Sequence, residues 1–259
     1  MSGTTDAALD LQHVADELGV HYQTAYRWVR TGKLPARLVN GKYQVRLDDI
    51  DRFRTSRVVE HPPAPPSPQR LHRHADSMHT ALVNGDEADV RHIARSLVGE
   101  GTPVIELIQT VLVPPLRRIG QSWHDGEISI WVEHRASAIV ERLLGEIATN
   151  PRGRRKGSVL VAAVAGDRHS LPTAMAALTL RDANWDVHHL GADMPPEELY
   201  SFCDANDVDV AVISSTNSDA AELAAETAAA LTARGTPAIL GGPGSTLESL
   251  LERCEAARS

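Results

Sequence analysis

From residue 157 to 259, short apolar runs alternate with longer stretches whose apolar residues recur at helical spacing. Apolar strands that are separated by helices form a parallel sheet with helices on both faces. We therefore predict a doubly wound, Rossmann-like α/β domain over this part of the chain. The expected strands cover 159–164, 187–190, 208–213 and 238–240, and the expected helices cover 173–182, 197–205, 220–234 and 247–256.

Three loops follow expected strands, at the sheet edge where such domains bind ligands. They cover 166–172, 214–216 and 241–244, and none has the GxGxxG or GxxxxGK[ST] spacing of a nucleotide site. In the first loop, Asp167 precedes His169 by two residues, and a carboxylate so placed can fix the tautomer of a metal-binding imidazole. An ordinary loop histidine is the alternative. Because no second ligand lies nearby, zinc is disfavoured, and a metal held inside a macrocycle fits a single histidine better.

A proline-rich segment, 61–68, separates this region and the helical region before it from the N-terminus. Prolines at this density cannot continue a helix or a central strand, so we expect an extended linker over 58–73. The chain then divides into an N-terminal domain over 1–57, a helical domain over 74–150 and the α/β domain over 157–259.

The N-terminal segment predicts a winged helix-turn-helix. A helix over 22–30 follows a first short helix, and Asn40-Gly41 between extended runs indicates a hairpin, the wing. Residues 20–46 contain six basic side chains and no acidic one, which favours double-stranded DNA over a protein partner. The segment resembles the DNA-binding domain of MerR-type and excisionase-type regulators. The residues expected to contact DNA are Gln23, Thr24, Arg27 and Arg30 in the groove, and Arg37 and Lys42 at the phosphates.

The middle segment, 74–150, predicts a four-helix bundle. Apolar residues recur at helical spacing along four stretches with short connections. His134 falls nearly opposite the apolar stripe of the last helix, on a side with small residues, and a surface histidine is the simplest interpretation. Trp123 lies on the stripe of the preceding helix, where core packing is the expected role.

Composition limits the class of protein. The formal net charge is −8, but residues 1–55 carry +1. No apolar run reaches the ~18 residues of a membrane span, the N-terminus has no secretion signal, and the two cysteines suit a reducing compartment. We expect a cytoplasmic protein without a membrane segment.

The three loops resemble the signatures of cobalamin-binding domains, in the same order. Asp167-x-His169, Ser214-x-Thr216 and Gly241-Gly242 carry this resemblance. It implies that His169 binds cobalt from below and that the cofactor's nucleotide tail passes the serine and the two glycines. Two residues depart from the family pattern, Pro172 for a glycine and Thr216 for a leucine, which bears on affinity and on placement of the tail.

The bundle resembles the cap that precedes such domains, through the motifs Asn84-Gly85-Asp86, Pro115-Leu116, Gly120-x-x-Trp123, Gly126-Glu127 and Glu133-His134. Nine residues separate Trp123 from Glu133-His134, and with this spacing the whole chain resembles the CarH/LitR light-sensing repressors, MerR-type regulators that use adenosylcobalamin. The resemblance implies that Trp123 and Glu133 pack against the adenosyl group. It also implies that His134 takes the upper cobalt position after light, and that a dark homotetramer binds an operator and releases it on illumination.

Three other functions share parts of this pattern. A light-independent cobalamin sensor would have every motif, and a corrinoid carrier for methyl transfer would have the two C-terminal segments but no use for a helix-turn-helix. An adenosylcobalamin radical enzyme would need a substrate domain that 259 residues leave no room for. We therefore expect a regulator, most simply a repressor, and not an enzyme.

Overall fold

The computed structural model describes residues 8–18, 20, 22–30, 32–39, 41–59, 67–148, 151 and 153–258; within these ranges the side chains of residues 16, 23, 27 and 54–59 are not described. The chain forms two compact units, residues 1–64 and 65–259. Across the described residues, no helix combines the length and the apolar character of a membrane span.

The N-terminal unit is the predicted winged helix-turn-helix. Helices α1 (Leu11–Glu17) and α2 (Tyr22–Arg30) pack on a three-stranded antiparallel sheet of order β1-β3-β2, which is followed by α3 (Leu47–Val59). The strands are β1 (Ala8–Asp10), β2 (Arg37–Val39) and β3 (Lys42–Arg46), and the β2–β3 hairpin is the wing. The core of this unit consists of Leu11, Val14, Ala15, Ala25, Trp28, Leu34, Val45 and Ile50.

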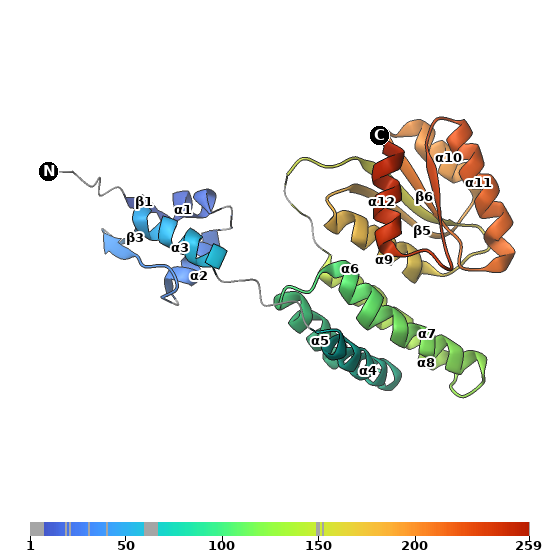
Figure 1. The fold of residues 1–259 in the computed structure, drawn as a ribbon, viewed down its shortest axis with the longest axis horizontal. Helices are drawn as coiled ribbons and strands as arrows, with labels where there is room; N and C mark the ends of the chain where they lie inside the picture. Colours follow the sequence, from blue (N-terminus) through green and yellow to red (C-terminus); the bar gives the residue numbers. More distant parts are fainter. Residues whose placement is uncertain are drawn as a thin grey trace. The chain divides into compact units, whose positions relative to one another are not determined.

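The second unit begins with the helical bundle (Figure 1), and its first helix starts earlier than predicted. Helix α4 (Pro68–Asn84) begins with a proline, which suits a first turn because the proline N–H would have no helical partner there. On the N-terminal side of the expected linker, α3 continues to Val59. The expected linker of 58–73 is therefore too long at both ends, and the bundle starts at residue 68 instead of 74.

The third helix of the bundle is continuous, although the sequence places Pro114 and Pro115 within it and two prolines are expected to interrupt a helix. Helix α6 (Val104–Glu106) runs through a π-helical stretch (Leu107–Leu112) into α7 (Val113–His124). The Val113 N–H donates to the carbonyl oxygen of Ile108, five residues back, so the hydrogen-bond register changes immediately before the two prolines, which have no N–H to donate. Helices α5 (Glu87–Gly99) and α8 (Ile130–Ile147) complete the bundle.

The C-terminal part is the predicted doubly wound domain. Four parallel strands lie in the order β5-β4-β6-β7, with α9 and α12 on one face of the sheet and α10 and α11 on the other (Figure 1). The strands are β4 (Ser158–Val164), β5 (Asp186–Met194), β6 (Val210–Ser214) and β7 (Ala238–Gly241). The helices are α9 (Ser170–Asp182), α10 (Pro196–Ala205), α11 (Ala221–Ala233) and α12 (Leu247–Arg258), with a short 3-10 turn at Ser218–Ala220.

The bundle and the α/β domain share an apolar core. Met175 and Leu178 of α9 belong to the same buried cluster as the bundle's own apolar residues. Two polar contacts accompany it: the Ser170 hydroxyl donates to Glu141 of α8, and Gln109 donates to Glu248 of α12 at 2.8 Å. The bundle therefore packs against α9, the helix that begins directly after the loop that carries His169.

Candidate functional site

The sheet has its topological switch point between β4 and β6. After β4 the chain crosses to β5 on one side, and after β5 it returns to β6 on the other side of β4. The loops that follow β4 and β6 therefore diverge and leave a crevice at the carboxyl edge, which is where ligands of such sheets bind. Asp167 and His169 lie in the first of these loops and Thr216 lies in the second.

Asp167 joins the two loops. Its side chain is fully buried and accepts hydrogen bonds from the Thr216 N–H at 2.6 Å and from the Thr216 hydroxyl at 3.0 Å. It also accepts from the His169 N–H at 3.1 Å and contacts the His169 ring Nδ1 at 2.7 Å. Burial alone would raise the pKa of Asp167, but the hydrogen bonds from Thr216 and His169 outweigh it and hold this pKa below its usual value. The carboxylate is therefore ionised at neutral pH.

This carboxylate determines which nitrogen of His169 is free. An ionised carboxylate only accepts hydrogen bonds, so Nδ1 of His169 is the donor, and in the neutral ring Nε2 then keeps its lone pair. The side chain of His169 is 65% exposed. A fixed ring with an accessible, unprotonated Nε2 is what a metal ligand requires.

The two departures from the family pattern fit the structure. Pro172 is the third residue of α9, within the first turn, where its missing N–H costs no helical hydrogen bond. The hydroxyl of Thr216 donates to Asp167. This contact ties together residues 49 positions apart, and nothing local in the sequence indicates it.

Ser214, Gly241 and Gly242 lie at the carboxyl ends of β6 and β7. Ser214 is the last residue of β6, is buried, and pairs in register with Gly241 of β7. A Cβ at Gly242 would collide with the carbonyl oxygen of Ser215, whereas a Cβ at Gly241 would meet nothing within 4 Å. Gly242 therefore allows the two loops to approach each other, and Gly241 borders open space.

The cap residues lie at the end of the bundle. Trp123, in the last turn of α7, is 43% exposed, so the expectation that it packs in the core is wrong: the buried stripe ends one turn earlier, at Ile119. On α8, the His134 ring Nδ1 lies 2.7 Å from Glu133, whose other oxygen accepts from Ser137 at 2.8 Å. The side chain of His134 is 69% exposed, as expected for a residue opposite the apolar stripe.

The contact between Glu141 and Ser170 orients α8. Ser170 directly follows His169, and Glu141 lies seven residues after His134, which is close to two helical turns. His134 therefore projects from the same face of α8 as Glu141, about 10 Å further along the helix axis. That face is the one from which α8 contacts the loop of His169.

The expected DNA contacts lie on α2 and the wing. Arg30, Arg37 and Lys42 are exposed, and Thr24 is half-buried. The side chains of Gln23 and Arg27 lie outside the described part of the structure. The basic residues described here are therefore open to a partner on the two elements that enter or flank the groove in winged helices.

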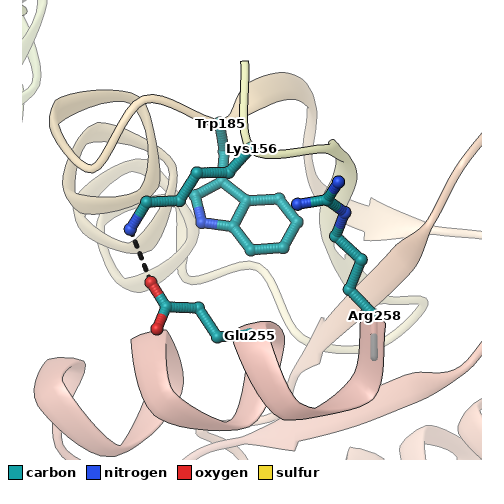
Figure 2. Close-up of a pocket in the computed structure, with 4 residues that line it drawn as sticks. All are labelled: Lys156, Trp185, Glu255 and Arg258. Carbon is teal, nitrogen blue, oxygen red and sulfur yellow. Dashed lines mark hydrogen bonds and ion pairs between the residues drawn. The ribbon is translucent and has the colours of Figure 1, made fainter. Parts of the chain in front are cut away.

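A separate cavity of about 430 Å³ lies at the amino-terminal edge of the sheet, away from the motif loops. Figure 2 shows its lining: the indole of Trp185 lies between Lys156 and Arg258, and Lys156 pairs with Glu255 at 2.5 Å. None of these residues belongs to the three loop motifs. The geometry assigns the candidate site to the switch point instead.

Comparison with known proteins matches each of these parts. A helix-turn-helix domain model matches residues 8–58, and two models described as B12 binding domains match residues 75–147 and 157–257. The HTH-type transcriptional repressor CarH of Myxococcus xanthus is 31% identical over 125 residues. The chain therefore matches a helix-turn-helix model and two B12-binding models, and it is similar to CarH over about half of its length.

Corrinoid proteins are also similar to this chain. A corrinoid protein of Desulfitobacterium hafniense is 26% identical over 128 residues. The two alignments cover 47% and 48% of this chain and 59% and 41% of those relatives, so the chain spans about half the length of the curated relatives it matches. The monomethylamine corrinoid protein of Methanosarcina barkeri shares the fold of the second unit, with a TM-score of 0.54 at 16% identity over 72% of this chain and 95% of that one.

Proposed function

We propose that this CarH-like chain is a light-responsive transcriptional repressor that binds adenosylcobalamin, forms a homotetramer in the dark and releases its operator DNA on illumination. The observation that supports this most strongly is the set of contacts made by Asp167. This buried carboxylate joins two loops and orients the accessible His169 at the switch point of a domain that matches a B12-binding model. The same chain carries a helix-turn-helix domain, which a sensor of that cofactor needs to act on DNA.

The residues at the switch point suit a corrinoid held through cobalt. His169 offers Nε2 as the lower ligand, Asp167 fixes its tautomer, and the open space beside Gly241 leaves room for a tail near Ser214 and Gly242. On the upper side, Trp123 and Glu133 would contact the adenosyl group, and His134 would occupy the upper position once that group has left. When bound, adenosylcobalamin supplies a cobalt–carbon bond that visible light can break.

The link from cofactor to DNA is a population shift in this proposal. A bundle packed on the occupied site favours the oligomer, and loss of the adenosyl group removes what holds that packing in place. One winged helix makes few contacts, whereas tethered copies bind an operator with much greater avidity. Dissociation of the oligomer therefore releases DNA without any change in α2 or the wing.

A corrinoid carrier for methyl transfer is the second candidate, because two of the similar proteins are corrinoid proteins. The winged helix with exposed Arg30, Arg37 and Lys42 favours the regulator, since a carrier has no use for it. A light-independent cobalamin sensor would share every feature, so only a light response separates it from the photoreceptor.

The deciding experiment loads the purified full chain with adenosylcobalamin in darkness. Absorbance, size-exclusion elution and binding to DNA are followed before and after green illumination. We expect a spectral change, a shift to smaller species and release of DNA in the wild type. A chain that binds the cofactor and DNA but is indifferent to light is the simple sensor, and one that binds cofactor without any affinity for DNA is the carrier.

Two histidine variants test the upper ligand. His134→Ala should photolyse normally but lack the spectrum of cobalt held by two imidazoles. His124→Ala is the matched control, because His124 is also exposed and ends the neighbouring helix α7. Loss of that spectrum in His124→Ala, with His134→Ala unaffected, would assign the upper position to His124 and contradict our assignment.

A further inference from the structure

The cavity at the amino-terminal edge of the sheet has a surplus of hydrogen-bond donors. It measures about 430 Å³ and is lined by Lys156, Trp185, Glu255 and Arg258 (Figure 2). Three of these four side chains offer only N–H donors, and the fourth, Glu255, offers acceptors. Two positive charges and one negative charge leave the lining net positive. The cavity therefore suits a ligand that is anionic and rich in acceptor atoms.

Two of the donors in this lining have no partner. The indole of Trp185 is buried, and its Nε1 makes no hydrogen bond within the part of the chain that the structure describes. Figure 2 shows that the ring edge with Nε1 faces the side of the cavity where Lys156 and Glu255 pair at 2.5 Å. Among the same described residues, the exposed guanidinium of Arg258 has no ion-pair or hydrogen-bond partner. A buried N–H without a partner is unfavourable, so an acceptor that reaches Nε1 gains a hydrogen bond at little cost.

The backbone beside the cavity is shaped to bring the two cations next to the indole. A Cβ at Gly157 would lie 2.9 Å from Cζ3 of Trp185 and 3.0 Å from Cδ of Arg258, so only glycine lets the chain pass this closely. The N–H of Lys156 donates to the carbonyl oxygen of Asn184 at 2.9 Å, which joins the chain before β4 to the residue before Trp185. The start of β4 and the end of α12 are therefore held on either side of one buried ring.

A phosphate group matches the chemistry of this lining. Arginine binds phosphate through two parallel N–H bonds, and lysine binds it as a point charge. The volume lies within the range of about 300–1,000 Å³ that is typical of small-molecule sites, which leaves room for an organic group beside the phosphate.

We propose that this cavity binds a small phosphate ester, with its phosphate between Arg258 and Lys156. The phosphate replaces Glu255 as the partner of Lys156, and the opening of that pair gives it access to the buried Nε1 of Trp185. Glu255 opposes the ligand, because its carboxylate competes for Lys156 and repels a second anion. The inference does not depend on the proposed function, since the cavity lies at the opposite edge of the sheet from His169.

The test measures binding of inorganic phosphate and of glycerol phosphate to the purified full chain by isothermal titration calorimetry. Arg258→Gln should weaken binding of both probes about tenfold or more, because a charge-assisted, two-bond contact is lost. Glu255→Gln should strengthen binding severalfold, because the competing charge is removed. Arg253→Gln is the matched control: Arg253 is another exposed arginine of α12, but it donates to the carbonyl oxygen of Leu240 and does not line the cavity.

Two results would overturn the inference directly. One is the absence of saturable binding of both probes to the wild type. The other is equal affinity in the wild type, Arg258→Gln and Glu255→Gln. These results do not involve cobalamin, so they leave the proposed function as it stands, and a failure to load cobalamin leaves the phosphate titration as it stands.

Two further arms distinguish other sources of phosphate. Because the tail of cobalamin contains a phosphate, the titration is repeated on the cobalamin-loaded chain, where unchanged affinity is expected. Displacement by the cofactor would assign the phosphate to the cofactor site and contradict the inference. Binding of a DNA duplex should be equal in the wild type and Arg258→Gln. Weaker binding of DNA with unchanged binding of glycerol phosphate would make this edge a contact for the DNA backbone, and the inference would be wrong.

Discussion

Two carboxylate–histidine pairs with the same hydrogen bond lie in different surroundings. In each pair, Nδ1 of the histidine lies 2.7 Å from a carboxylate oxygen, in Asp167–His169 on the sheet edge and in Glu133–His134 on α8. The side chain of Asp167 is fully buried, whereas that of Glu133 is 27% exposed. Asp167 also accepts hydrogen bonds from a second loop, whereas Glu133 contacts His134 and Ser137 of its own helix.

The difference indicates which half of the site is formed in advance. A buried carboxylate with several donors holds its histidine in one position, because any displacement leaves buried polar groups unpaired. An exposed pair contributes little to stability and can separate at small cost, because water replaces the bond. The lower ligand of the proposed site is therefore rigid before a cofactor arrives, while His134 is free to change partners.

The largest predicted effect is that of removing the buried carboxylate. Asp167→Ala leaves the donors of Thr216 and His169 unpaired and should lower the free energy of unfolding by about 3 kcal/mol. Freed from its carboxylate, His169 should bind cobalamin 10- to 100-fold more weakly, at about the size of effect known for such partners of metal ligands. Chemical denaturation and equilibrium dialysis measure the two quantities.

Glu133→Ala is the matched control for that variant. It removes the carboxylate of the exposed pair and should change the free energy of unfolding by about 0.5 kcal/mol. Losses of equal size in the two variants would show that burial does not distinguish the pairs, and the contrast drawn above would then be wrong.

We expect a moderate effect of low pH on the free energy of unfolding. Because the pKa of Asp167 is lower in the folded chain than the ordinary value of 3.8, its contribution to stability is complete above that value and is lost as the pH falls through the lowered pKa. Asp167→Asn has no such group. The stability difference between wild type and Asp167→Asn should therefore stay constant from pH 7 down to about 4 and shrink below it, as urea unfolding at successive pH values can measure. A difference that is independent of pH below 4 would contradict a lowered pKa.

Much of the fold follows from sequence because its signals are local. Apolar runs such as 159–164 and 208–213, separated by helical spacing, predicted both the parallel sheet and its double winding. Because ligands of such sheets bind at the carboxyl ends of the strands, the sequence also predicts that the Asp167 and Thr216 loops lie at one edge. The wing hairpin was equally predictable from Asn40-Gly41, although residue 40 lies outside the described residues.

The features that the sequence did not predict depend on contacts between distant residues or on where a helix or its buried stripe ends. The bond from Thr216 to Asp167 joins two loops, and the identity of Thr216 alone suggests only a hydroxyl. The exposure of Trp123 depends on where the bundle's core ends, which a periodic stripe does not reveal. Proline at 114 and 115 looked like a helix break because the π-helical stretch before it has no known local signature.

The smallest predicted effect concerns one hydroxyl in each pair. Thr216→Val keeps the shape of the side chain and the N–H bond to Asp167 but removes the hydroxyl donor, and should cost about 1 kcal/mol of unfolding free energy. Ser137→Ala removes the matching donor to Glu133. Its loss should be close to zero, because the bond is partly exposed and alanine is a better helix former than serine by about 0.5 kcal/mol. Both values come from the same denaturation assay. If Ser137→Ala costs as much as Thr216→Val, the cap pair is as rigid as the lower one, and His134 could not leave Glu133 as readily as the proposed light response requires.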